Sequence, residues 1–158
     1  MAFTPADDYL VTSLQGVSQS ARDVNNALAN WGGDYLGLLN IVEKSRGIVA
    51  AAVAVVLPIT RNPPTDDILQ ARQKAAKSLA EDVNVTLNSG IAAKPKVENL
   101  TIPMKPTIAA VLKSAQAGFS ALGKVYLEDF PAEQKDANQA IFTGINDDLQ
   151  KCLDAYQS

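Results

Sequence analysis

Residues 10–33 read LVTSLQGVSQSARDVNNALANWGG, and this stretch indicates the fold class. Apolar side chains recur in it at alternating spacings of three and four residues, which is the period of one buried stripe on an α-helix. The stripe comprises Leu10, Leu14, Val17, Ala21, Val24, Leu28 and Trp31. Gly32 and Gly33 then end the pattern, so the stretch predicts one long amphipathic helix followed by a tight turn.

Four further helices are predicted from the residues that start and stop them. Capping side chains and prolines favour helix N-termini, and glycine or proline ends a helix. We expect the second helix to stop at Pro58, the third to weaken at residues 88–90, and residues 94–105 to form a loop. No alternating strand pattern is sustained, so we predict an all-α antiparallel bundle of five long amphipathic helices. The five expected starts are Thr4, Asp34, Thr65, Pro106 and Pro131.

The inner faces of the predicted helices are aliphatic and small. Phe119 is the only phenylalanine on an expected inner face, and no arginine or lysine falls cleanly on one. We expect the C-terminal half of the second helix to be the most enclosed part, because it is apolar nearly all round. Its inner face is expected at Leu38, Val42, Val49, Val53 and Val56. The fifth helix is expected to turn inward Ala137, Ile141, Ile145, Leu149, Cys152 and Tyr156.

The composition of the 158 residues excludes several kinds of chemistry. Histidine is absent, which removes histidine-dependent catalysis and histidine-ligated zinc. Cys152 is the single cysteine, so no internal disulfide is possible, and we expect it to be a small buried hydrophobe. A net charge of −3 offers no basic excess for nucleic acid. Acidic pairs such as Asp7-Asp8 fall at helix starts or on solvated faces, so we predict no enzyme, no metal and no cofactor.

Glycine is unusually placed for a helical bundle. Each glycine inside a helix costs about 0.5–1 kcal/mol relative to alanine, so a compensating role is expected. The glycines inside the predicted helices are explained either by close approach of two helices or by room for a ligand between the helices. Aliphatic inner faces would suit an alkyl chain, at roughly 0.8 kcal/mol per buried CH₂, although periodicity alone favours a filled core. The six interior glycines are Gly16, Gly37, Gly47, Gly118, Gly123 and Gly144.

Few polar side chains fall on or beside the apolar faces. Ser45 and Ser114 do, and each either bonds the backbone carbonyl four residues earlier or meets a ligand carboxylate. Asn84 and Asn99 each begin an N-glycosylation sequon, and Asn99 is the more plausible acceptor because it lies in the expected loop. The longest uncharged apolar run, residues 48–59, is shorter than the roughly 20 residues that span a bilayer.

Residues 23–35, DVNNALANWGGDY, carry a family resemblance. A long amphipathic helix, an aromatic-Gly-Gly turn and a second helix rich in small apolar residues follow in order. With the later proline-rich loop and two closing helices, the whole chain resembles one lipid-binding domain of the fungal antigenic cell-wall galactomannoproteins, which belong with the hydrophobic surface-binding protein A family.

This resemblance implies a helical bundle around a long apolar cavity that takes fatty acids, including arachidonic and palmitic acid. It implies a non-enzymatic secreted or cell-wall virulence factor, with residues 1–158 a single domain excised from a larger mannoprotein. The oligomeric state is open between a monomer and a helix-exchanged dimer. Combined with the inner faces, it leads us to expect Ser45 or Ser114 at the carboxylate. The expected lining is Leu14, Val17, Val42, Val49, Leu79, Val111, Leu112, Ala115, Phe119, Ile141 and Ile145.

A second function remains open at this point. The second family name suggests a surface-active structural protein that adsorbs to hydrophobic surfaces and recruits partners. That function needs an exposed apolar face, whereas a fatty-acid carrier needs an internal cavity.

Overall fold

The computed structural model describes residues 5–57 and 63–158, and within these ranges the chain is helical without strands. Five long helices and one short one follow a single 3₁₀ turn, Pro5–Asp7. The predicted all-α bundle is therefore confirmed, with one additional short helix. The helices are α1 (Tyr9–Ala29), α2 (Tyr35–Val53), α3 (Asp66–Ala92), α4 (Lys94–Glu98), α5 (Lys105–Leu127) and α6 (Ala132–Gln157).

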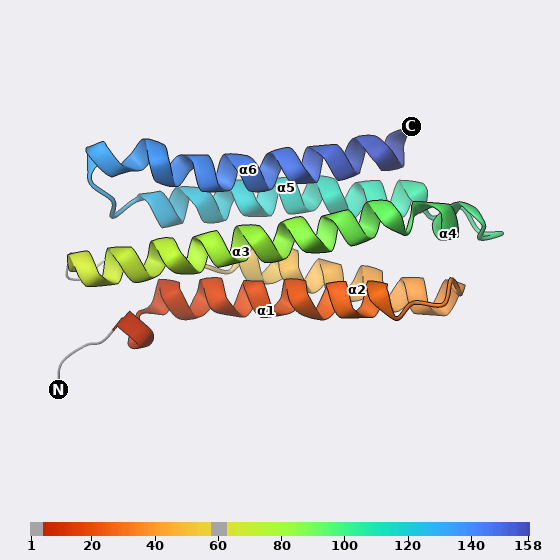
Figure 1. The fold of residues 1–158 in the computed structure, drawn as a ribbon, viewed down its shortest axis with the longest axis horizontal. Helices are drawn as coiled ribbons and strands as arrows, with labels where there is room; N and C mark the ends of the chain where they lie inside the picture. The colour runs from red at the N-terminus through yellow and green to blue at the C-terminus, as the bar shows by residue number, and fades with distance from the viewer. Residues whose placement is uncertain (1–4, 58–62) are drawn as a thin grey trace.

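The five long helices lie side by side along one axis, and consecutive ones run in opposite directions (Figure 1). Around the axis they pack in the order α1, α2, α5, α6, α3, and α3 closes the ring onto α1. Each long helix therefore packs mainly against two neighbours and turns its apolar face toward the centre. A short α4 lies at one end of this ring, next to the C-terminal end of α3 (Figure 1).

Side-chain caps begin three of the long helices. The Asp8 carboxylate accepts from Val11 N at 3.1 Å, the Asp34 carboxylate from Gly37 N at 2.8 Å and the Thr65 hydroxyl from Ile68 N at 3.4 Å. Each bond satisfies an N–H that has no partner inside its helix. The cap at Asp34 and the start of the third helix near Thr65 agree with the sequence prediction. The cap of the first helix is Asp8; the predicted Thr4 lies outside the described residues, as does Pro58.

The bundle has two unlike halves because α2 is short. A Cβ on Gly118 of α5 would lie 3.4 Å from Val53 Cγ2, so α2 ends about level with Gly118, whereas α5 continues to Leu127. In the half that contains α4, five helices surround the axis. Beyond Val53, four of the long helices surround the axis: α1, α3, α5 and α6. Aromatic rings fill the centre of this second half. The Tyr126 ring centroid lies 5.0 Å from that of Phe130 and 5.1 Å from that of Phe142.

Several predicted inner faces are wrong at particular positions. Val53 and Val56 are 56% and 65% exposed, so the C-terminal half of α2 is not the most enclosed part; the buried residues there are Ile48 and Ala52, and Val55 is buried just beyond the helix. The face of α2 turns away because the helix ends beside Gly118 instead of continuing along α5. Residues 94–105 are not entirely loop, since Lys94–Glu98 forms α4 with proline in its first turn. Helix α3 also continues through residues 88–90 to Ala92.

The predicted inner face of the last helix is out of register by one residue in its first half. Ala137 is exposed, whereas Asn138 is 1% exposed and Phe142 is buried. Asn138 is satisfied there: its carboxamide oxygen accepts from the Tyr126 hydroxyl at 2.5 Å, and its Nδ2 donates to Gln134 O at 2.9 Å. Phe119 is therefore not the only phenylalanine on an inner helix face.

A buried arginine also contradicts the expectation that no cation faces inward. Arg72 of α3 donates from Nε and Nη2 to the Asp8 carboxylate, each at 2.8 Å, and from Nη1 to Asp129 at 3.0 Å. Arg72 and Asp8 are about equally buried, so the two-bond pair compensates for their removal from water. This cluster joins α3 to the start of α1 and the α5–α6 turn, in the half of the bundle away from α4.

Candidate functional site

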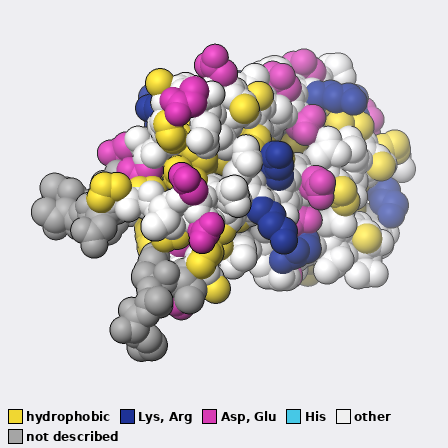
Figure 2. Space-filling model, turned by 60° about the vertical axis from the view of Figure 1, so that its left-hand side comes forward, with side chains coloured by type: hydrophobic (Ala, Val, Ile, Leu, Met, Phe, Trp, Pro, Cys, Tyr) yellow, Lys and Arg dark blue, Asp and Glu magenta, His cyan; other side chains and the backbone are white. Residues whose placement is uncertain are grey.

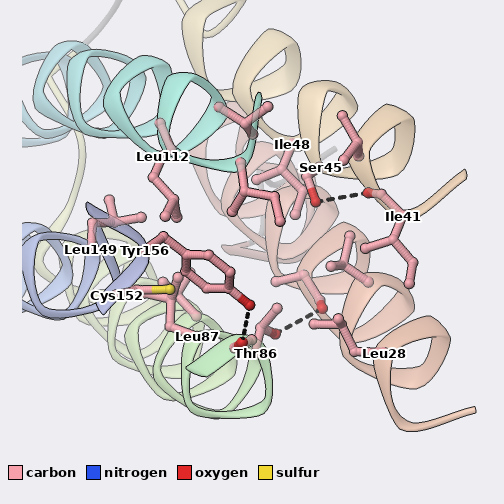
Figure 3. A pocket seen from close by; sticks show the side chains of 18 of the residues that line it. Leu28, Ile41, Ser45, Ile48, Thr86, Leu87, Leu112, Leu149, Cys152 and Tyr156 are labelled. Carbon is pink, nitrogen blue, oxygen red and sulfur yellow. Dashed lines mark hydrogen bonds between the residues drawn. The ribbon is translucent and has the colours of Figure 1, made fainter. Parts of the chain in front are cut away.

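An apolar cavity of about 120 Å³ lies on the bundle axis in the half that five helices surround (Figure 3). All five long helices contribute side chains to its wall, and α4 and the residue before it close one end with Val97 and Ala93. Five helices around one axis leave a wider centre than four. The aliphatic side chains of α2 and α5 do not fill this centre.

Most of the lining is aliphatic. Hydrocarbon surfaces face the space from every side, which suits an alkyl chain and not a polar substrate. None of the lining residues, which are drawn from the described part of the chain, carries a charge. The apolar lining is Ala21, Val24, Leu28, Leu38, Ile41, Val42, Ile48, Val49, Val83, Leu87, Gly90, Ala93, Val97, Ile108, Val111, Leu112, Ala115, Phe119 and Leu149.

Four side chains with a polar atom complete the wall, and three of them donate to backbone carbonyls. Ser45 Oγ donates to Ile41 O at 2.8 Å, and Tyr156 Oη donates to Gly90 O at 2.5 Å (Figure 3). Thr86 Oγ1 lies 2.9 Å from Ala21 O and 2.7 Å from Asp82 O. The hydroxyl protons are therefore used within the protein, and only oxygen lone pairs remain for another partner.

Cys152 is the fourth polar member of the wall, and it is buried as predicted. Burial raises the pKa of its thiol to about 11. The thiol therefore stays protonated near neutral pH and acts there as a small apolar group. No group of three histidine, cysteine, aspartate or glutamate side chains within residues 5–57 and 63–158 is arranged to hold a metal ion.

The structure places seven of the thirteen predicted binding residues in the cavity wall. Because α2 and α5 provide the longest contiguous parts of that wall, all seven come from these two helices. They are Val42, Ser45, Val49, Val111, Leu112, Ala115 and Phe119.

The other six predicted residues do not line the cavity. Ser114 is exposed on α5, and Ile141 is half-buried on α6. The remaining four are buried core residues whose inward direction was predicted correctly. Periodicity could not indicate their position along the axis, and they pack outside the cavity: Leu14, Val17, Leu79 and Ile145.

Other lining residues were not predicted. Ile41 and Ile48 lie beside the predicted stripe of α2 and are spaced seven residues apart, so the same periodicity could have identified them. Tyr156 was predicted to face inward but was not named as a binding residue, and Thr86 was not predicted at all. Each hydroxyl donates to the backbone of another helix, a pairing that depends on tertiary structure and leaves no local sequence signal.

Three of the six interior glycines allow close packing, because a Cβ at each would contact a neighbouring side chain. A Cβ on Gly123 would lie 3.1 Å from Phe142 Cγ, and one on Gly118 would lie 3.4 Å from Val49 Cγ1. A Cβ on Gly37 would lie 2.7 Å from an atom of Trp31. Gly16, Gly47 and Gly144 face open space, and nothing in the structure explains them. None of the six lines the cavity.

The two predicted glycosylation sites differ in their surroundings. Asn84 lies within α3, where its Nδ2 donates to Asp148 Oδ2 at 2.9 Å, so its amide is already engaged. Asn99 is exposed at the C-terminal end of α4, where an acceptor side chain is accessible. Modification at Asn99 stays a prediction.

Sequence comparison finds no matching family model and no matching curated protein. Comparison with solved structures finds the same fold at low identity. The protein AfMP4p in complex with palmitic acid matches with a TM-score of 0.74 and 16% identity, over 93% of this chain and 97% of that one.

Two ligand-binding domains of the Penicillium marneffei MP1 protein match as well. Domain 2 in complex with arachidonic acids gives a TM-score of 0.79 at 16% identity, over 92% of this chain and 90% of that one. Domain 1 complexed with arachidonic acids gives a TM-score of 0.72 at 16% identity, over 92% of this chain and 94% of that one.

These likenesses establish the fold as an all-helical bundle, and the apolar cavity on the axis is a feature of this chain's own structure. The solved structures that share this bundle are fungal antigenic mannoproteins, the family that residues 23–35 resemble. The fold implied by the resemblance is therefore confirmed.

Proposed function

We propose that this protein binds a long-chain fatty acid non-catalytically, with the acyl chain along the bundle axis. The observation that carries the proposal is the uncharged, mostly aliphatic cavity in a fold shared with a palmitic-acid complex and with arachidonic-acid complexes. Burying a chain of about sixteen to twenty carbons would contribute on the order of 10 kcal/mol before the costs of association.

The proposal requires the cavity to widen when the ligand enters. An apolar protein cavity of about 150 Å³ takes one benzene molecule, and the cavity here measures about 120 Å³. A long-chain fatty acid therefore needs the helices to move apart along its length. Helix α2 is the shortest long helix and packs on its two neighbours, α1 and α5, less extensively than the other long helices pack on theirs, so its outward displacement disrupts the least packing.

We extend the proposal to the setting implied by the family resemblance: a secreted or cell-wall protein of which these residues form one lipid-binding domain. In that setting the protein would sequester free fatty acids such as arachidonic acid. No helix within residues 5–57 and 63–158 is both long and apolar enough to cross a bilayer.

Adsorption to hydrophobic surfaces has less support. It needs a continuous exposed apolar face, and Figure 2 shows hydrophobic side chains interspersed with charged ones on the side that it views. The exposed large hydrophobic residues come from different elements, as Leu36 on α2, Val85 on α3 and Ile102 in a loop illustrate. Within residues 5–57 and 63–158, Val53 and Val56 are the only two of this set that are near neighbours in sequence.

Native mass spectrometry of the purified protein, followed by organic extraction, tests the proposal. We expect a bound mass that matches one or two fatty acids, or saturable uptake of added palmitate and arachidonate by protein that was purified empty. A bare protein that takes up neither acid would contradict fatty-acid binding. Adsorption to wax without a defined stoichiometry would then favour the surface-active alternative.

A further inference from the structure

Among the described residues, the cavity has no charged partner for the head group of a fatty acid. Its described lining carries no cation, and the three hydroxyl groups in the wall donate to backbone carbonyls. Burying an unpaired carboxylate is costly. If the proposed function holds, on which this inference rests, the acyl chain lies in the cavity while the carboxylate must reach a cation or water.

A second hollow lies directly behind one wall of the cavity. It is a surface groove of about 660 Å³ between α5 and the last turn of α6. Lys105 and Lys113 lie eight residues apart on the same face of α5, and Ala109 between them leaves the groove open. Tyr156 lines both this groove and the central cavity, so its side chain forms part of the partition between them.

The partition is held by one hydrogen bond from the tyrosine. Tyr156 Oη donates to Gly90 O of α3 at 2.5 Å, which fixes the ring across the space between α6 and α3 (Figure 3). The last turn of α6 is also tied through Ser158, whose hydroxyl oxygen accepts from Lys94 at 3.0 Å and whose carbonyl accepts from Lys105 at 3.0 Å. This bond joins a side chain to the Gly90 carbonyl and is not one of the backbone hydrogen bonds within α6, so breaking it leaves that helix's own ladder intact.

The two lysines differ in what already engages them. Lys105 Nζ lies 3.5 Å from Glu98 Oε2, in addition to its bond to Ser158. Lys113 is exposed and forms no ion pair or hydrogen bond with any residue of the described ranges. Lys96 of α4 is also engaged, because its Nζ donates to Trp31 O at 3.2 Å. Neither Lys96 nor Trp31 lines the cavity. The groove that shares Tyr156 with the cavity therefore offers one lysine, Lys113, that has no partner within the described ranges.

We propose that the α5–α6 groove is the entrance of the cavity and binds the fatty-acid carboxylate, with Lys105 and Lys113 as its cations and Tyr156 as its gate. The acyl chain passes the displaced tyrosine ring into the cavity. The carboxylate stays in the groove, where it keeps contact with water and both ammonium groups. The uncharged cavity then never has to accept the charge.

The charge contribution is tested with the double variant Lys105→Ala/Lys113→Ala. Its affinity is measured for cis-parinaric acid, a fluorescent polyunsaturated fatty acid, and for the corresponding alcohol. We expect the double variant to weaken binding of the acid about fivefold, because the charge interactions of the half-buried Lys105 and the exposed Lys113 with the carboxylate are lost, and to leave the alcohol unchanged. Lys124→Ala is the control, because Lys124 is exposed on the same helix in the half away from the cavity.

The gate is tested with Tyr156→Phe, which removes the hydroxyl and keeps the ring. In stopped-flow experiments we expect association of both acid and alcohol to be about fivefold faster, since one hydrogen bond no longer opposes opening. Tyr126→Phe is the control: Tyr126 is also buried and also donates through its hydroxyl, but it lies among the aromatic rings of the other half.

Three results would overturn the entrance. Equal losses of acid and alcohol affinity in the double lysine variant would exclude carboxylate recognition in the groove. Association rates in Tyr156→Phe that match those of Tyr126→Phe would exclude the gate. A wild-type protein that binds neither ligand would refute the proposed function itself, a result that differs from the other two because it precedes any variant.

Discussion

Gly123 of α5 lies so close to Phe142 of α6 that a Cβ at this glycine would stand 3.1 Å from Phe142 Cγ. The missing side chain lets the two helices approach, and Phe142 in turn packs on Tyr126, with ring centroids 5.1 Å apart. These aromatic side chains fill the axis of the bundle where α2 is absent. The same four helices continue into the half that contains the cavity, so this aromatic packing holds together the helices that form most of the cavity wall.

Gly123→Ala is expected to lower the free energy of unfolding by about 1–2 kcal/mol, because the added methyl group overpacks against Phe142. Gly144→Ala is the matched control on α6, where a Cβ meets open space. That variant is expected to raise the free energy of unfolding by about 0.5–1 kcal/mol through helix propensity alone. Chemical denaturation measures both, and stabilisation by Gly123→Ala would contradict the close approach.

Periodicity predicts which way a helix faces, and it succeeded where a face is purely apolar. The stripe of α1 from Leu10 to Trp31 is inward along its length, with only Leu28 half-buried. It failed on α6, where Asn138 is buried and Ala137 is exposed, because the Tyr126 hydroxyl supplies the partner that a buried amide needs. A local pattern contains no information about that partner.

The sequence pattern also could not predict where along the axis the cavity lies. Leu14 and Leu112 are both inward, yet only Leu112 lines the cavity. The difference arises because α2 ends at Val53, so that five helices surround one half of the axis and four the other. Helix ends could be predicted to within a few residues, but which helix ends beside which level of its neighbour is set by packing.

Arg72 and Asp8 form a buried pair from residues 64 positions apart in the sequence, and the pair predicts a pH dependence. Burial alone would raise the pKa of Asp8, but the hydrogen bonds from Arg72 and from Val11 N outweigh it and hold the pKa below 3.8. A carboxylate with a lowered folded-state pKa adds stability above its unfolded pKa of about 4. We therefore expect the contribution of Asp8 to be complete at pH 7 and lost as the pH falls below about 4.

Asp8→Asn tests this pair. At pH 7 the variant is expected to lose roughly 3 kcal/mol of unfolding free energy, because Arg72 is left buried with one carboxylate partner. The difference from wild type should shrink as the pH is lowered below about 4, because there Asp8 of the unfolded wild-type chain takes up a proton more readily than the folded carboxylate does. Glu43→Gln serves as the control, since Glu43 pairs with Arg46 on an exposed face and should matter little. A pH-independent difference would contradict the ionic account.

Cys152 offers a chemical reporter of the cavity. With its pKa raised to about 11, the thiol should react slowly with iodoacetamide at pH 8, and its rate should rise with pH well beyond the range of an exposed cysteine, whose pKa is about 8.5. Bound palmitate should slow the reaction further, because Cys152 lines the cavity. Mass spectrometry follows the labelling. A normal pH profile, or no protection by palmitate, would contradict this placement.

Filling the cavity with a side chain should abolish binding without unfolding the bundle. Ala115→Trp adds an indole to the cavity wall, and a space of about 120 Å³ is smaller than the cavity of about 150 Å³ that takes one benzene, so the indole occupies it fully. We expect palmitate affinity to fall at least about tenfold, with helicity by circular dichroism unchanged. Ser114→Trp is the matched control, because Ser114 is the next residue on α5 and is exposed. Equal affinities in the two variants would place the fatty acid outside this cavity, whatever the wild-type protein binds.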